Sequence, residues 1–181
     1  MRRSREFPGR GGDQTPAREG AAELARAATE IGIWTAVAAF AREHLGASHV
    51  FVLRRDAAAA VAETAFSQVF SSGGSTPVHA FRSAAALSGM GLVAAPPAPG
   101  TGGTFASLFE AVPGAAAGLA YAEIDSSHVL VLVYRGACPV LSRRSWLLLD
   151  DLRHRAATAL AAVPGRQPPA AAGPDETFHD P

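Results

Sequence analysis

The chain has 181 residues, of which 48% are hydrophobic, and its 16 cationic residues balance 16 acidic residues to a formal net charge of zero. This length and composition allow one core of ordinary size, and the neutral balance predicts no basic face for nucleic acid. All cationic residues are Arg, and neither Lys nor Asn occurs, which excludes Schiff-base chemistry, a Walker lysine and N-glycosylation.

Cysteine use and hydropathy bear on the compartment. The single Cys138 cannot form an internal disulfide, which is typical of a reducing compartment, so we expect a cytoplasmic protein. The basic start at residues 1–5 is followed by Gly, Pro and polar residues, which does not match a signal peptide. No apolar run has the length of a membrane span, so we expect no membrane partner.

Residues 1–15 and 165–181 are rich in Gly, Pro and charge, and we expect disordered tails on one domain spanning 16–164. The domain should begin with one long helix over 17–45, with Thr15 as a possible cap and Gly46 after its end. Gly32 within it predicts a kink or a close backbone contact. Its apolar stripe comprises Leu24, Ala28, Ile31, Trp34, Ala38, Ala41 and Leu45.

The middle of the chain reads as short elements. Apolar and alternating runs predict strands over 48–53, 61–70 and 92–94, and a short extended piece over 77–81. The connection 57–60 is all Ala and fits either a strand extension or a turn of helix. Short helices are expected over 83–87 and from Thr104 to Pro113, on either side of a flexible loop at 95–104.

The last third has the clearest pattern. Two apolar runs, 118–124 and 128–134, flank Asp125-Ser126-Ser127-His128 and predict a β-hairpin. Residues 129–134 are apolar at every position, which indicates a central strand covered on both faces. Ser142 then caps a final helix whose apolar face is formed by Leu148, Leu149, Leu152, Ala156, Ala159, Leu160 and Val163.

This order predicts an α+β fold: an antiparallel β-sheet, a loop-rich middle segment, and long N-terminal and C-terminal helices packed on one face. Four segments carry a resemblance to a known family, namely residues 45–53, 118–122, 129–133 and 141–160. Over about residues 20–162 the chain resembles the GAF domain family, with a GAF/PAS-like layout.

The resemblance implies a sensory or regulatory fold that dimerises through its terminal helices and holds a small molecule between the sheet and the middle segment. The departures are informative. The Asn-Lys signature of cyclic-nucleotide-binding members is absent, and Cys138 follows the last strand instead of lying in the middle region where bilin-binding members attach their chromophore. The branch similar to free methionine sulfoxide reductase needs several cysteines. We therefore expect no cofactor and no enzymatic activity.

The candidate pocket is mainly aromatic, and both core packing and a ligand wall remain open interpretations. Its residues are Phe66, Phe70, His79, Phe81, Arg82, Phe105, Phe109 and Tyr121. The six scattered histidines have no metal-ligand spacing, so we expect no metal and ordinary surface or turn histidines. Ser126-Ser127-His128 is interpreted as a turn, since neighbours in a hairpin do not form a nucleophile and base pair.

We therefore predict a cytoplasmic, non-enzymatic GAF-like module that is a homodimer through the helices 17–45 and 143–163 and signals to a separate effector protein. The candidate dimer interface comprises Leu24, Ile31, Trp34, Leu152 and Ala156. The alternative is a structural protein-interaction module of roadblock-like or profilin-like layout whose pocket is filled by its own phenylalanines. An enzyme using Cys138 is a minor third option.

Overall fold

The computed structural model describes residues 15–56, 64–74, 81–83, 87–94, 108–109, 112, 116–135 and 142–165. The predicted tails other than Thr15 and Gly165, the 57–60 connection and the 95–104 loop lie outside the described residues. The elements in chain order are α1 (Thr15–Arg26), α2 (Glu30–His44), β1 (His49–Asp56), β2 (Thr64–Ser72), β3 (Phe81–Ser83), β4 (Met90–Ala94), β5 (Ala116–Glu123), β6 (His128–Arg135) and α4 (Arg143–Ala161).

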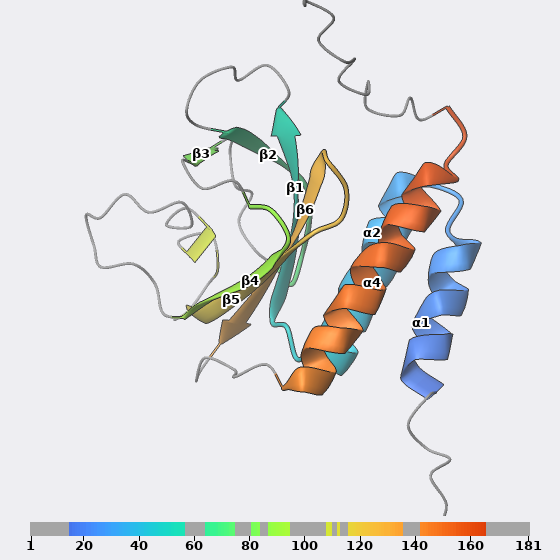
Figure 1. Cartoon of the computed structure of the whole chain (residues 1–181), viewed down its shortest axis with the longest axis horizontal. Coiled ribbons are helices and arrows are strands. Elements are labelled where there is room, and N and C mark those ends of the chain that lie inside the picture. The colour runs from blue at the N-terminus through green and yellow to red at the C-terminus, as the bar shows by residue number, and fades with distance from the viewer. Residues whose placement is uncertain are drawn as a thin grey trace, which may run out of the picture.

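The strands form one six-stranded sheet in the order β3-β2-β1-β6-β5-β4, and every neighbouring pair is antiparallel (Figure 1). Strand β6 lies between β1 and β5, and all its residues except Arg135 are buried. The predictions of an antiparallel α+β fold, of the β5–β6 hairpin and of a central last strand are confirmed. Of the short helix predicted over 83–87, Ser83 instead ends strand β3, and residues 84–86 lie outside the described residues.

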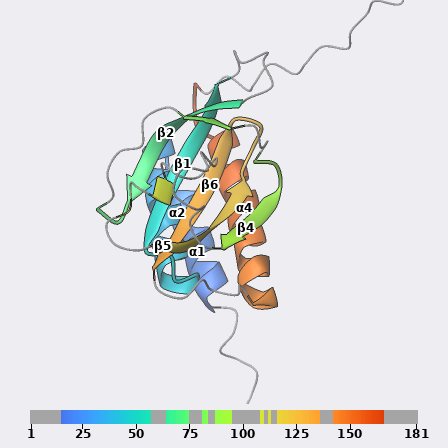
Figure 2. The same cartoon turned by 90° about the vertical axis from the view of Figure 1, so that its left-hand side faces the viewer.

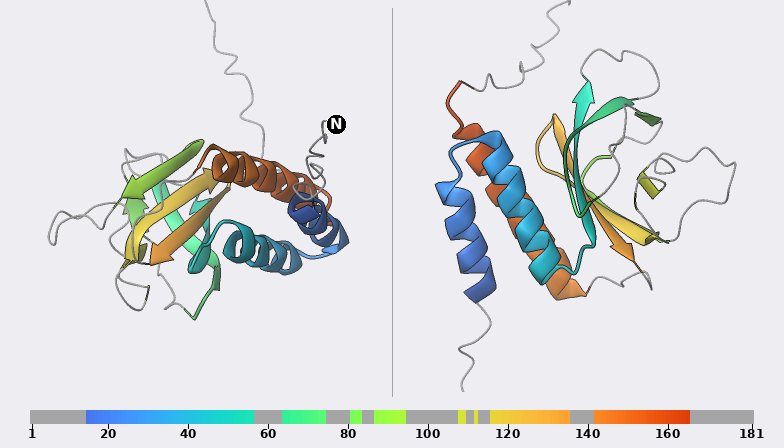
Figure 3. Two further views of the ribbon diagram at one scale, coloured as in Figure 1. Left: turned by 90° about the horizontal axis from the view of Figure 1, so that it is seen from below. Right: turned by 180° about the vertical axis from the view of Figure 1, so that it is seen from behind.

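The sheet separates two apolar cores. Alternate residues of β1 point to opposite faces. Val50 and Val52 join a cluster with α2 and α4, which we call the helix-side cluster, whereas Phe51 and Leu53 join a second cluster on the other face. Helices α2 and α4 cover the first face, as Figure 3 shows, and in Figure 2 the sheet lies in front of them. The predicted packing of both helical regions on one face is confirmed.

The predicted single helix over 17–45 is wrong, because the chain breaks between α1 and α2. Thr29 is extended (φ −130°, ψ 153°), and its side-chain oxygen accepts a hydrogen bond from the Gly32 N–H at 3.1 Å. This cap starts a new helix in place of continuing the old one. A Cβ at Gly32 would lie 3.2 Å from Thr29 Oγ1, so the glycine leaves room for the cap and does not kink a longer helix.

The break also changes which side chains of this region are buried. Ala28 is exposed and Ile31 is 61% exposed, although both belong to the predicted stripe. The buried face of α2 comprises Ile33, Trp34, Val37, Ala38, Phe40 and Ala41. The predicted stripe therefore holds at Leu24 and from Trp34 onward and fails at Ala28 and Ile31, because the extended Thr29 resets the helical phase.

Helix α1 folds back along α2 and α4 and lies farthest from the sheet (Figure 1). The two helices approach closely at Gly20, where a Cβ would lie 2.4 Å from Phe40 Cδ2, and four residues later Leu24 is only 3% exposed. Gly20 and Leu24 are the buried positions among the described side chains of α1. The two helices thus form a helical hairpin in which Gly20 and Leu24 face the rest of the domain.

Helix α4 follows its prediction. Ser142 Oγ accepts a hydrogen bond from the Ser145 N–H at 3.1 Å, which confirms the predicted N-cap. Leu149, Leu152, Ala156 and Leu160 are buried against the sheet and α2. The helix ends at Ala161, just before the predicted Pro164-Gly165 stop.

Candidate functional site: the loop-side face of the sheet

The face of the sheet opposite α2 and α4, which we call the loop-side face, is where sequence analysis expects a ligand. It carries a buried cluster in which strand residues meet residues of the middle segment. The cluster consists of Phe51, Leu53, Phe66, Leu87, Leu108, Phe109, Val112, Ala116, Leu119, Val129, Val131 and Val133, with Val93 and Tyr121 packed against it. Such a wall of apolar and aromatic side chains is typical of small-molecule sites.

Three of the predicted pocket residues meet on this face. Phe66 is fully buried, Phe109 is 8% exposed, and the half-buried Tyr121 packs against the same cluster. A Cβ at Gly91 would lie 2.4 Å from Tyr121 Cζ, so the Tyr121 ring lies directly over the backbone of the neighbouring strand β4. The three aromatic side chains therefore belong to one apolar cluster on the sheet.

Phe70 does not belong to this face, contrary to prediction. It packs against the helix-side cluster, although it lies four residues after Phe66 in the same strand and simple alternation would give both one face. The cause is a bulge: Val52 pairs with Phe70 but Leu53 pairs with Gln68, so one residue of β2 is skipped. An extra residue in one strand moves all following side chains to the other face.

The remaining predicted pocket residues are less fully described. Phe81 and Arg82 lie in the edge strand β3, where they pair with Phe66 and Ala65. His79 and Phe105 lie outside the described residues.

An ion pair that sequence analysis missed lies at one end of β1 and β5. Arg55 Nη1 donates to Glu123 Oε1 at 2.6 Å and to the Ser126 carbonyl at 3.2 Å, and the Gly89 N–H donates to Glu123 Oε2 at 2.8 Å. Burial alone would raise the pKa of Glu123, but the hydrogen bonds from Gly89 and Arg55 outweigh it, and the pKa lies below 4.5. The ionised pair ties β1, the start of β4 and the hairpin together.

The hairpin tetrad is a turn, as predicted, but its histidine is not on the surface. Asp125 Oδ1 accepts hydrogen bonds at 2.8 Å from the Ser127 and His128 N–H groups. The His128 ring is 4% exposed, with Nδ1 3.0 Å from Asp125 Oδ1 and Nε2 3.6 Å from Glu30 Oε1. Trp34 lies beside it, with ring centroids 5.4 Å apart. This contact joins the hairpin to the first turn of α2.

His49 is buried in strand β1, contrary to the prediction of an ordinary surface or turn histidine. It is 2% exposed, its Nδ1 lies 3.0 Å from Ser48 Oγ, and its Nε2 lies 3.5 Å from Arg135 Nη2. Burial lowers the pKa of His49, and the charges of Arg135 and Arg42 lower it further, while a hydrogen bond to the Gly73 backbone opposes them. Folding therefore favours the neutral form of the His49 ring.

The predicted dimer interface needs correction. Leu24, Trp34, Leu152 and Ala156 are at most 3% exposed in a single chain, because they pack on the sheet and on neighbouring helices of the same molecule. Only Ile31 of the five predicted residues is exposed, at 61%. Four of the five are thus core residues, and any helical dimer of the closed chain would use other side chains.

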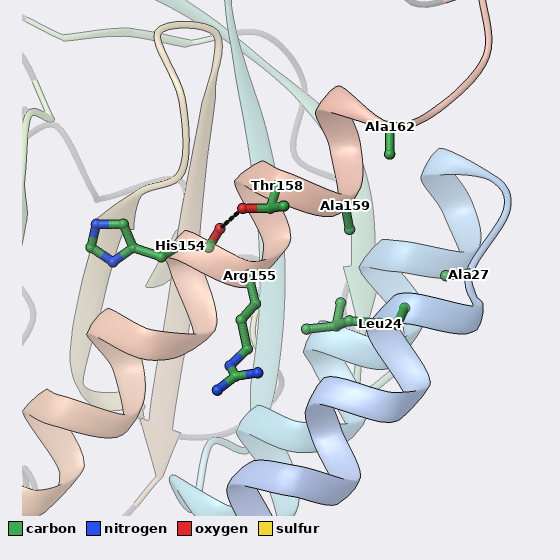
Figure 4. A pocket seen from close by; sticks show the side chains of 8 residues that line it. Leu24, Ala27, His154, Arg155, Thr158, Ala159 and Ala162 are labelled. Atoms are coloured by element: carbon green, nitrogen blue, oxygen red, sulfur yellow. Dashed lines mark hydrogen bonds between the residues drawn. The ribbon is translucent and has the colours of Figure 1, made fainter.

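A groove of about 410 Å³ runs between α1 and α4 (Figure 4). Leu24, Ala27, Ala159 and Ala162 form its apolar lining, and Arg155 projects into it while forming an ion pair with Asp151 at 2.7 Å. A second groove of about 410 Å³ runs between α1 and α2. Sequence analysis missed both grooves because they exist only when α1 folds back.

Within the described part of the chain, no group of three or more His, Cys, Asp or Glu side chains could hold a metal ion. Among the same residues, no helix combines the length and apolar character that a membrane crossing requires.

A six-stranded antiparallel sheet with terminal helices on one face and a middle segment on the other defines a GAF-like fold. Solved structures support this at low sequence identity. The phycocyanobilin-bound GAF domain of a cyanobacterial phytochrome aligns with a TM-score of 0.57 and 12% identity over 82% of this chain and 93% of its own. The fold of this chain is therefore that of a GAF domain.

Two further structures are similar. The Stigmatella aurantiaca phytochrome photosensory core module has a TM-score of 0.61 and 13% identity over 88% of this chain, which spans 38% of that module's length. The free methionine-R-sulfoxide reductase of Neisseria meningitidis, in complex with its substrate, has a TM-score of 0.60 and 11% identity over 87% of this chain and 95% of its own. No protein-family model and no curated protein matches the sequence.

Proposed function

We propose that residues 16–164 form a non-enzymatic, cytoplasmic sensory or regulatory domain that binds a small molecule at the loop-side face and signals, as a homodimer, to a separate effector protein. The observation that carries this proposal is the loop-side cluster. There the middle segment contributes Leu108, Phe109 and Val112 to an apolar core that strands β1, β5 and β6 share. A segment that packs on a sheet can change its packing when a ligand enters.

Two arguments favour a sensor over an enzyme. First, two of the three similar structures described above are photosensory or bilin-bound proteins, and one is an enzyme. Second, thiol-based sulfoxide reduction needs a second thiol to resolve the oxidised cysteine, and this sequence, with one Cys, cannot provide it within the chain. A cytoplasmic location agrees with the same lone cysteine.

Signal transfer would follow the strands through the sheet. Val131 and Val133 of β6 lie in the loop-side cluster, and their neighbours Leu130 and Leu132 lie in the helix-side cluster. A shift of β6 caused by a ligand would therefore reach α2 and α4 directly. The Trp34–His128 contact lies at the end of this route and offers an intrinsic fluorescent reporter.

Thermal melting against a panel of metabolites tests ligand binding. A ligand present at 100 times its Kd stabilises the native state by about 2.7 kcal/mol, which corresponds to a rise in Tm of roughly 5–10 °C for a domain of this size. Val93 packs on the loop-side cluster, whereas its neighbour Leu92 is 37% exposed and pairs with Ala120 of the helix-side cluster. We expect Val93→Ala and Tyr121→Leu to reduce the rise and the matched control Leu92→Ala to preserve it. An equal loss in all three variants would contradict binding at the loop-side face.

The second candidate is a structural interaction module without a ligand. It is favoured by the complete burial of Phe66 and the near-complete burial of Phe109, which fill the loop-side face with the chain's own side chains. A panel in which no compound raises Tm would support this candidate over the sensor.

A further inference from the structure

The groove between α1 and α4 has no part in the proposed function (Figure 4). Its volume is about 410 Å³, and its apolar surface comes from Leu24 and from the short side chains of Ala25, Ala27, Ala159 and Ala162. Leu24 is 3% exposed, so it lies deepest among these residues. An apolar space of this size is within the range of small-molecule sites.

Arg155 places hydrogen-bond donors in this groove. Its Nε donates to Asp151 Oδ2 at 2.7 Å, and its side chain, which is 43% exposed, projects into the groove (Figure 4). Among the residues that the structure describes, none accepts a hydrogen bond from the two Nη groups of Arg155. The bond to Asp151 orients the guanidinium, and the Nη groups remain available to an anion.

The charges around the groove favour an anion at one end of it. The ionisable residues of its described lining are Arg155 and His154, neither of which can be negative. Ala27 follows the last residue of α1 and Ala162 follows the last residue of α4, so the carbonyl ends of both helices lie at the opposite end of the groove. The partial negative charge of a helix C-terminus disfavours an anion there. An anionic group would therefore bind near Arg155, with apolar lining beyond it.

We propose that this groove binds a free fatty acid of medium chain length. The carboxylate accepts hydrogen bonds from the Nη groups of Arg155, and the chain lies over Leu24 and runs towards Ala162. Residues 155 to 162 span about 10 Å of α4, and an extended chain advances about 1.2 Å per bond, so a chain of about ten carbons fits. This site is separate from the loop-side face and does not depend on a ligand there.

Calorimetric titration of the full chain with monomeric decanoate tests the carboxylate contact. We expect Arg155→Gln to raise the Kd at least about 10-fold. Asp151→Asn is the matched control, because it breaks the same ion pair and keeps the guanidinium. Its Kd should equal that of the wild type or be lower, since Asp151 no longer competes for Arg155. An equal weakening in both variants would overturn the proposed contact.

The apolar end of the groove has its own pair of variants. Ala162→Leu fills the groove and should raise the Kd for decanoate at least about 10-fold. Ala161→Leu adds the same atoms at the neighbouring exposed position, which is not part of the described lining, and should change the Kd less than about twofold. Hexanoate should bind the wild type at least about 10-fold more weakly than decanoate, because four methylenes fewer are buried.

The remaining outcomes separate this groove from the proposed function. A wild-type chain that does not bind decanoate, or a Kd that Arg155→Gln and Ala162→Leu leave unchanged, would overturn the inference. Binding that Val93→Ala and Tyr121→Leu abolish and Arg155→Gln preserves would also overturn it, and would support a ligand at the loop-side face. Groove binding of decanoate that Val93→Ala and Tyr121→Leu leave intact would support the inference even if no other compound of the panel raises Tm.

Discussion

Replacing Glu123 with Gln removes the negative charge that holds the Arg55 side chain at the end of the β5–β6 hairpin. The Glu123 side chain is 27% exposed and the Arg55 side chain is 18% exposed. Glu123 accepts hydrogen bonds from Arg55 at 2.6 Å and from the Gly89 N–H at 2.8 Å. A hydrogen bond to a charged group contributes about 1.5–3 kcal/mol. Gln keeps a neutral acceptor, and Arg55 keeps a carbonyl partner. We therefore expect the free energy of unfolding to fall by about 2 kcal/mol, which is less than the loss from breaking a fully buried ion pair.

The pH dependence of the free energy of unfolding tests the same prediction independently. The pKa of Glu123 in the fold lies below 4.5, so in the unfolded chain this carboxylate takes up a proton at higher pH than in the fold. The stabilisation is therefore complete well above pH 4.5 and is lost as the pH falls below that value through the folded pKa. The wild type should lose stability over this window, and Glu123→Gln should lose less.

Urea unfolding at neutral pH and at a series of acidic pH values measures both effects. Glu43→Gln is the matched control, because the Glu43 side chain is 73% exposed and its loss should change stability by less than about 0.5 kcal/mol. A Glu123→Gln variant as stable as Glu43→Gln at neutral pH would refute the reasoning. So would a deficit that stays constant as the pH falls below 4.5.

Three more outcomes follow from the same structure. Because the pKa of His49 is lowered, the wild type should lose stability as the pH falls below 6.5, and His49→Gln should reduce that loss in urea titrations; an unchanged pH slope would contradict it. Gly73 and Gly74 both have positive φ, but only at Gly73 would a Cβ lie 2.6 Å from the Ser48 carbonyl oxygen, so Gly73→Ala should lower Tm clearly more than Gly74→Ala. Leu152→Ala should cost about 2–5 kcal/mol in chemical unfolding, whereas Leu147→Ala, at a position that is 61% exposed, should cost less than about 0.5 kcal/mol; similar costs would place the core elsewhere.

Local sequence was enough to predict the parts of the fold that depend on strong periodic signals. The uninterrupted apolar run of β6 indicated a strand covered on both faces, and the sheet order bears this out. Ser142, followed by helical periodicity, predicted the start of α4, and its hydrogen bond to the Ser145 N–H agrees.

The predictions were wrong where a small energy difference, or a contact between residues far apart in sequence, determines the structure. Thr29 breaks the first helix through a cap contributing about 1 kcal/mol and through the packing of Gly20 on Phe40, which no local pattern reveals. The bulge in β2 moves Phe70 off the candidate site by one skipped residue. His128 is buried because Glu30 and Trp34 of helix α2, far from it in sequence, contact it at the end of the β5–β6 hairpin.

The candidate site was only partly predictable for the same reason. Phe66, Phe109 and Tyr121 were expected together because the middle segment had to cover a sheet, and they do pack on one cluster. The helix residues predicted for a dimer were apolar and correctly spaced, but Leu24, Trp34, Leu152 and Ala156 are used by the chain's own core. Periodicity identifies an apolar face without saying whether the same chain or a second copy covers it.

Hydrogen exchange, with and without the compound that raises Tm most, tests the central claim that a ligand on the loop-side face acts through the sheet on the helices. We predict increased protection in β5 and β6 and around Leu108 and Phe109, together with altered exchange in α1 and at the start of α2. Protection confined to the groove between α1 and α4, with strands β5 and β6 unchanged, would contradict it.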